Sequence, residues 1–182
     1  MIGSIKSFIN SKFTPTDKTQ TLHTQYDGTT TGHSDDGAAG TTPRVTVAGR
    51  LVLFRSMGKN AFGHIQDSTG RIQVMFNKDI SKVTGYNGSN EATPEALSHM
   101  KLIEKKFDLG DIIGIEGYLF HTNKGELTIF VHNVTLLCKT LLPLADKHAG
   151  LADKELRYRK RWLDLITHDD VAHTFRQRSL LL

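Results

Sequence analysis

The stretch Arg44-Val-Thr-Val-Ala-Gly-Arg-Leu-Val-Leu53 decides the fold, because its apolar residues recur at every second position. The odd positions hold the apolar residues and one glycine: Val45, Val47, Gly49, Leu51 and Leu53. A period of two is the signature of a β-strand with one buried face. We therefore expect a strand here, with its odd-numbered side chains, Leu53 included, turned toward a core.

Four further runs of the chain have the composition and alternation of strands. They are residues 61–66, 72–76, 112–121 and 126–138. Asp67-Ser-Thr-Gly70 and Thr122-Asn-Lys-Gly125 have the residues of tight turns and separate neighbouring runs. In the last run the apolar positions change from odd to even, which predicts a one-residue bulge near Asn133.

One helix is expected between the third and fourth strands. Thr93-Pro-Glu95 suits a helix start, and apolar residues then recur at spacings of three and four as far as about Lys106. Five strands with one helix in this place follow the order of the OB-fold, a Greek-key barrel whose outer face commonly binds oligonucleotides. The predicted fold class is mainly β, with this barrel at residues 44–143.

The segments on either side of the barrel differ in composition. Residues 1–43 form a low-complexity lead, since residues 14–43 hold ten threonines and four glycines and little that can be buried, so we expect loose order there. Residues 144–182 have a helical pattern, in which Asp153 suits a helix cap and Asp169 or Asp170 a second helix start. The closing run of three leucines indicates a truncated further domain.

Composition narrows the class of protein and its location. The chain has 182 residues, 38% of them apolar, and contains no run of the roughly 20 apolar residues that a membrane span needs. The lone Cys138 predicts a reducing compartment, with the cytosol as the default. Residues 1–13 are weakly amphipathic, as an organelle transit peptide can be, so an organelle is the alternative location. A net charge of +4 favours a polyanionic partner.

The strand alternation also predicts a binding face. The side chains expected on the non-core face of the first three strands are Arg50, Phe62, His64, Gln73 and Met75. An exposed ring stacks an unpaired base, an amide reads the edge of the base, and a cation holds phosphate. The amide of Gln73 matches uracil in one orientation and cytosine in the other, so its neighbours must fix it before it discriminates. The alternative is that Phe62 packs beneath the lead segment or the trailing helices.

No catalytic or metal-binding residues are predicted. The chain lacks a phosphate-cradling GxxxxGK[ST] loop and a nucleophile elbow, and its histidines are not at ligand spacing. The basic residues Arg157, Arg159, Lys160 and Arg161 are interpreted as a helix face held by ion pairs with Asp153, Glu155 and Asp164, rather than as an RNA contact.

Several motifs together resemble the N-terminal anticodon-binding domain of lysyl-tRNA synthetases. The strand motifs are Val45-Thr-Val-Ala-Gly-Arg50, Met57-Gly-Lys59, Phe62-Gly-His-Ile-Gln-Asp67, Gly70-Arg-Ile-Gln73 and Asp108-Leu-Gly-Asp111. Aspartyl- and asparaginyl-tRNA synthetases share these motifs, whereas Lys124-Gly-Glu-Leu127 and Glu155-Leu-Arg-Tyr-Arg-Lys-Arg-Trp-Leu-Asp-Leu-Ile166 favour lysine. Residues 144–182 then resemble the linker and the start of a truncated α/β catalytic core.

The resemblance implies roles for particular residues. Phe62 would stack on the central anticodon base, Gln73 would read its edge, and Glu126 would contact a neighbouring base. Arg55 would serve as the remaining cation where the family often has two adjacent arginines, because Phe54 replaces the first. Arg50 and His64 complete the expected set of anticodon-binding residues.

The resemblance also implies an activity and partners. The family joins lysine to tRNA-Lys with ATP and magnesium, and its full-length members form homodimers. The ATP-binding motifs would lie beyond Leu182, so this chain is expected to bind the tRNA-Lys anticodon loop but neither cofactor, and not to aminoacylate. Two alternatives stay open: a self-standing OB-fold module that binds single-stranded RNA or DNA, and an anticodon-binding domain of the aspartyl or asparaginyl type.

Overall fold

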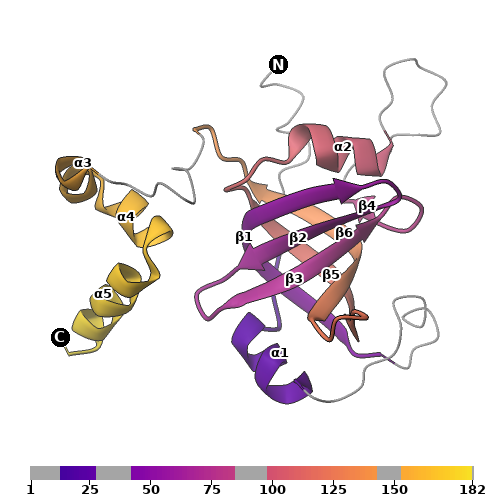
Figure 1. The fold of residues 1–182 in the computed structure, drawn as a ribbon, viewed down its shortest axis with the longest axis horizontal. Helices are drawn as coiled ribbons and strands as arrows, with labels where there is room; N and C mark the ends of the chain where they lie inside the picture. The colour runs from indigo at the N-terminus through magenta and orange to yellow at the C-terminus, as the bar shows by residue number, and fades with distance from the viewer. Residues whose placement is uncertain (1–12, 28–41, 85–97, 143–152, 182) are drawn as a thin grey trace. The chain divides into compact units, whose positions relative to one another are not determined.

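The computed structural model describes residues 13–27, 42–84, 98–142 and 153–181. These residues fall into two compact units, Met1–Leu141 and Leu142–Leu182. The first unit contains the sheet, and the second consists of helices (Figure 1).

The first unit is a closed barrel. Its strands are β1 (Arg44–Met57), β2 (Asn60–Gln66), β3 (Arg71–Asn77), β4 (Lys82–Val83), β5 (Ile112–His121) and β6 (Leu127–Cys138). The sheet runs β3-β2-β1-β5-β6-β4, and a parallel pairing of β3 with β6 closes it. The mainly β, OB-type barrel predicted from the sequence is confirmed, with the two-residue strand β4 as an addition.

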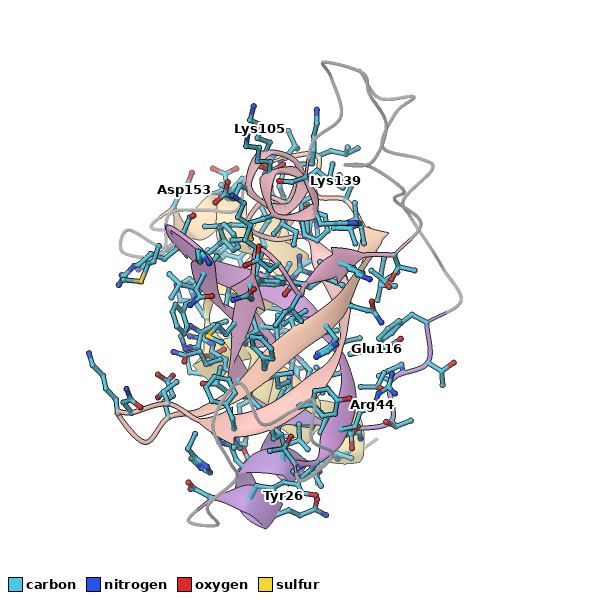
Figure 2. All side chains as sticks on the ribbon, turned by 90° about the vertical axis from the view of Figure 1, so that its right-hand side faces the viewer. Tyr26, Arg44, Lys105, Glu116, Lys139 and Asp153 are labelled. Atoms are coloured by element: carbon cyan, nitrogen blue, oxygen red, sulfur yellow. The ribbon has the colours of Figure 1, made fainter. Side chains whose placement is uncertain are left out.

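Two helices cover opposite ends of the barrel. They are α1 (Thr19–Tyr26) and α2 (His99–Lys106), and Tyr26 and Lys105 mark the two ends in Figure 2. The α2 helix begins at His99, because Ser98 is extended and its side chain accepts a hydrogen bond from the Lys101 N–H. The start predicted at 93–95 lies outside the described residues.

A bulge in β1 changes which side chains enter the core. The register of β1 against β2 shifts between Leu51 and Leu53, so Val52 is the extra residue. Beyond it Phe54 packs on the core, 5.9 Å from Phe76 between ring centroids, while Leu53 pairs with His64 on the other face. The prediction that Leu53 faces the core is therefore wrong, because residues 51–54 are all apolar and their pattern does not reveal the bulge.

The β6 bulge is where the sequence places it. Glu116 pairs with Asn133 and Gly117 with Val131, which leaves His132 unpaired in the ladder. The change of parity near Asn133 is thereby confirmed.

The lead segment is ordered over part of its length. The backbone N–H groups of Thr16 and Asp17 both donate to the Thr46 carbonyl at 3.0 Å, and Asp17 accepts from the Thr46 N–H at 2.9 Å. Leu22 of α1 is 1% exposed and belongs to the barrel core. The expectation of loose order is wrong for residues 13–27, because one buried leucine and these hydrogen bonds tie the segment to the barrel. Residues 28–41 lie outside the described residues.

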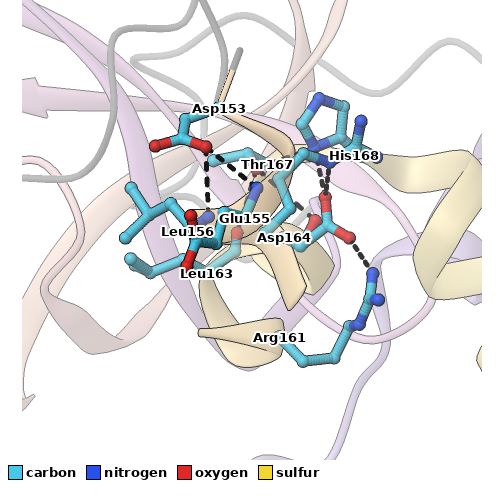
Figure 3. Close-up of polar contacts among 9 residues, drawn as sticks. Asp153, Glu155, Leu156, Arg161, Leu163, Asp164, Thr167 and His168 are labelled. Atoms are coloured by element: carbon cyan, nitrogen blue, oxygen red, sulfur yellow. Dashed lines mark hydrogen bonds and ion pairs between the residues drawn. The ribbon is translucent and has the colours of Figure 1, made fainter. Parts of the chain in front are cut away.

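The second unit contains α3 (Lys154–Arg159), α4 (Arg161–Thr167) and α5 (Asp169–Leu181). Asp153 caps α3 by accepting from the Glu155 and Leu156 N–H groups at 2.9 and 3.3 Å, as predicted. The carboxylate of Asp164 is fully buried and accepts hydrogen bonds from Arg157 and Arg161. Figure 3 shows the contact with Arg161.

The buried carboxylate organises the cations of this unit. The side chain of His168 lies 3.0 Å from Asp164 as well. Burial by itself raises the pKa of Asp164, but the hydrogen bonds and charges of Arg157 and Arg161 outweigh it and lower the pKa below its ordinary value. Arg159 pairs with Glu155 at 2.8 Å. Three of the four basic residues in the run therefore form the ion pairs expected of them.

Candidate nucleic-acid interface

Strand pairing brings two rows of side chains together on the outer face of the barrel. Residues directly opposite each other on neighbouring strands point to the same side of a sheet. One row, from β1 through β2, β3 and β6 to β5, is Arg55, Phe62, Met75, Phe130 and Tyr118. The other row is Leu53, His64, Gln73, Thr128 and Phe120. The first row is largely aromatic, and polar side chains occupy the middle of the second.

The aromatic row holds Phe62 at the surface. Met75, Phe120 and Phe130 are 5%, 5% and 3% exposed and form an apolar cluster outside the barrel core. Phe62 is half-buried and packs against this cluster. The predicted outward face of Met75 is correct, but its neighbours bury it. Phe62 is thus supported from beneath while part of its ring stays accessible, which is the condition for stacking on a base.

The polar side chains in the middle of the second row, His64, Gln73 and Thr128, form a hydrogen-bond network with Glu126, and we call these four residues the polar row. One carboxylate oxygen, Oε1, lies 3.1 Å from His64 Nε2, and the other, Oε2, accepts from Gln73 Nε2 at 2.7 Å. The Thr128 hydroxyl donates to Gln73 Oε1 at 2.7 Å. A carboxylate only accepts hydrogen bonds, so the nitrogen of the Gln73 amide must face Glu126. The neighbours of Gln73 therefore fix its orientation, as base discrimination requires.

The hairpin between β5 and β6 positions Glu126. The Gly125 N–H donates to the Thr122 carbonyl at 2.7 Å, and the Thr122 N–H donates to the Glu126 carbonyl at 3.0 Å. Gly125 has φ +80°, a left-handed conformation that residues with a side chain rarely adopt. The turn that positions Glu126 thus requires glycine at position 125.

The two predicted arginines have different positions. Arg55 is exposed and pairs across the ladder with Phe62, because the β1 bulge turns it outward. Arg50 pairs with Gln66, four residues from Phe62 and so about 13 Å along the strand. Its Nη1 donates to the Gly110 carbonyl at 2.8 Å. The structure brings together Phe62, His64, Gln73, Glu126 and Arg55, but does not place Arg50 beside them.

Thr128 is not among the predicted site residues, yet its side chain is fully buried beside Gln73. Its even position in β6, before the bulge, was a signal for the outer face. The parallel pairing of β3 with β6 sets it against Gln73, and local alternation does not reveal that pairing.

Two absences among the described residues concern metal binding and membrane insertion. No three His, Cys, Asp or Glu side chains among them are grouped so as to hold a metal ion. No helix in the described parts of the chain is long and apolar enough to cross a membrane.

A closed barrel that carries an aromatic ring, a fixed amide and a cation on its outer face defines an OB-fold protein of the nucleic-acid-binding class. Comparison with known families agrees: the model of the tRNA anticodon type of OB-fold nucleic acid binding domain matches residues 45–137, just over half of the chain. The chain belongs to this family.

Curated relatives of the chain include lysine–tRNA ligases. The chain is 55% identical to that of Chlamydia caviae over 171 residues, which cover 94% of this chain and 32% of the relative. It is 59% identical to that of Chlamydia pneumoniae over 151 residues, covering 83% and 28%. It is 50% identical to that of Legionella pneumophila over 139 residues, covering 76% and 25%. The resemblance read from the motifs is confirmed, and the chain spans about a third of the length of the relatives it matches.

Proposed function

We propose that the outer face of the barrel binds the anticodon loop of tRNA-Lys, as the tRNA-reading part of a lysine–tRNA ligase. One observation carries the proposal: the same outer face holds Phe62, which is partly exposed and packed against an apolar cluster, and Gln73, whose amide is held in one orientation. The family match and the lysine–tRNA ligase relatives support the choice of RNA.

Each residue has a physical task in this proposal. Phe62 stacks on the central anticodon base, a contact worth about 1–3 kcal/mol. Gln73 offers its second N–H and the free lone pair of Oε1 to the edge of that base. Glu126 contacts a neighbouring base. Arg55 of β1, which pairs with Phe62 of β2, supplies the cation for phosphate.

The rest of the activity is proposed from the relatives alone. A lysine–tRNA ligase uses ATP and magnesium to join lysine to its tRNA. We propose that the chain by itself binds tRNA without aminoacylating it. Pairing of two copies and a cytoplasmic location belong to the same proposal.

Binding to anticodon stem-loops tests the function. The chain is titrated at one fixed salt concentration with a stem-loop carrying the uridine-rich lysine anticodon, and with a second that has the same stem and a scrambled loop. We expect the lysine loop to bind more tightly. Equal affinities would instead indicate a non-selective single-strand binder, and tighter binding of an aspartate or asparagine anticodon would indicate the related synthetases.

A further inference from the structure

We infer that Glu126 is a specificity-determining positioning residue, which sets the direction of the Gln73 amide and so decides which pyrimidine the site accepts. The inference rests on the proposed function, and it adds a second role to the direct base contact of Glu126. It concerns the base that Gln73 reads, rather than the neighbouring base.

An amide that is free to turn cannot tell uracil from cytosine. Uracil presents an acceptor beside a donor on its pairing edge, and cytosine presents the reverse order. The two ends of a glutamine amide have nearly the same shape, and a half-turn exchanges its donor and acceptor. Discrimination therefore requires a neighbour that tolerates only one of the two orientations.

Of the two polar neighbours, only the carboxylate has this property. The Thr128 hydroxyl now donates to Gln73 Oε1 at 2.7 Å, and it has a second acceptor in the Glu126 carbonyl at 3.1 Å. If the amide turned over, the hydroxyl would accept from Nε2 and donate to that carbonyl, so Thr128 tolerates both orientations.

Glu126 Oε2 cannot make that exchange. A turned amide would place its carbonyl oxygen against a carboxylate oxygen, replacing a 2.7 Å hydrogen bond by repulsion between two acceptors. A hydrogen bond to a charged group is strong enough to favour one orientation by about 10- to 150-fold. The acceptor-only chemistry of Glu126 therefore sets the amide direction.

The rest of the network holds the carboxylate for this task. His64 Nε2 lies 3.1 Å from Oε1, so the histidine binds one oxygen while Gln73 binds the other. The hairpin fixes the backbone of Glu126 through the bond from Thr122 to its carbonyl. These contacts orient Glu126 at the start of β6, and from there its carboxylate reaches Gln73.

The test is Glu126→Gln, because a glutamine at 126 has nearly the same shape but can face Gln73 with either an N–H or an oxygen. The dissociation constants of lysine-type stem-loops with uridine or cytidine at the central position are compared, at fixed salt. We expect the wild-type chain to prefer uridine by about 5- to 150-fold, the range for paired hydrogen bonds to a base edge. Glu126→Gln should reduce this preference to within about twofold.

The matched control is Glu116→Gln, the same change in another half-exposed glutamate of the barrel. Glu116 lies beside Arg44, 3.4 Å away, on β5 rather than in the polar row (Figure 2). This variant should keep the wild-type preference. Circular dichroism confirms that each variant is folded before binding is measured.

A double variant separates action through Gln73 from direct contact. In a Gln73→Ala background, Glu126→Gln should cause no further change in the preference at the central base, because the residue through which it acts is absent. An additive loss there, or an unchanged preference in Glu126→Gln alone, would overturn the inference while leaving anticodon binding intact. A wild-type chain that does not distinguish the two loops would instead refute the proposed function, and this role of Glu126 with it.

Discussion

Replacing Asp67 by asparagine should loosen the N-terminal helix from the barrel. Asp67 lies in the turn between β2 and β3, and its Oδ2 accepts from the Thr19 N–H at 2.8 Å. Its Oδ1 accepts from the Thr19 hydroxyl at 2.8 Å and from the Thr69 and Gly70 N–H groups at 2.6 and 2.9 Å. One carboxylate thus closes its own turn and binds the first residue of α1.

The structure sets the size of the effect. Asparagine can keep one oxygen toward the turn, but its N–H₂ group then faces the Thr19 N–H, and Thr19 is fully buried. An unpaired buried donor costs about 1–3 kcal/mol. Because Asp67 is only half-buried, we expect Asp67→Asn to lower the free energy of unfolding by about 1–2 kcal/mol near neutral pH.

The pKa of Asp67 makes this effect dependent on pH. Burial by itself raises that pKa, but the hydrogen bonds from Thr19 and Thr69 outweigh it and lower the pKa to about 2 from 3.8. A carboxyl with a lowered folded-state pKa stabilises the fold fully above its unfolded value and loses this contribution as the pH falls through the folded value. The difference between wild type and Asp67→Asn should therefore shrink to about a third by pH 2.5.

Urea unfolding at pH 6 and at pH 2.5 measures the difference in unfolding free energy between wild type and Asp67→Asn at each pH. Hydrogen exchange at the Leu22 amide reports on α1 itself. Asp79→Asn is the control, because Asp79 is an exposed turn aspartate whose contact with Lys59 is 3.6 Å long and should contribute under about 1 kcal/mol. Equal unfolding free energies for wild type and Asp67→Asn at pH 6 would refute the reasoning, as would a gap that stays constant down to pH 2.5.

Three further changes test other parts of the structure. Gly114→Ala would place a methyl group 2.7 Å from the ring of Phe13, so the ring must move, and thermal unfolding should show a loss of about 1 kcal/mol. Asp164→Asn removes the buried anion between Arg157 and Arg161, and should cost the helices of the second unit about 3 kcal/mol, visible as lost helicity in far-UV circular dichroism. Gln73→Ala should relax the preference among central anticodon bases more than it weakens binding, and equal losses on every base would contradict its role.

The alternation of apolar residues was enough to predict the barrel and most of the side chains on its outer face. Phe62, His64 and Gln73 lie on that face because β2 and β3 are regular strands, so counting positions works. Counting positions fails at Val52, because the bulge there turns Leu53 to the outer face and Phe54 toward the core. The bulge in β6 could be predicted because the apolar positions change parity there, whereas residues 51–54 of β1 are all apolar and show no such change.

Long-range contacts explain the other differences. The lead segment is poor in apolar residues, but Leu22 enters the core and Asp67 binds Thr19 from 48 positions away. The polar network needs β3 beside β6, and that parallel pairing follows from barrel closure. Arg50 has the expected outward parity, yet its bond to Gly110 depends on where the chain returns after α2.

The most direct test of the anticodon-binding account is the affinity of Phe62→Ala for the uridine-rich anticodon stem-loop at fixed salt. Leu109→Ala is the control, because Leu109 is an exposed apolar residue, 48% accessible, outside the outer-face rows. Loss of the stacking ring should raise the dissociation constant at least fivefold, which corresponds to about 1 kcal/mol, while Leu109→Ala leaves it unchanged. A dissociation constant for Phe62→Ala equal to that of the wild-type chain would contradict the placement of RNA on this face.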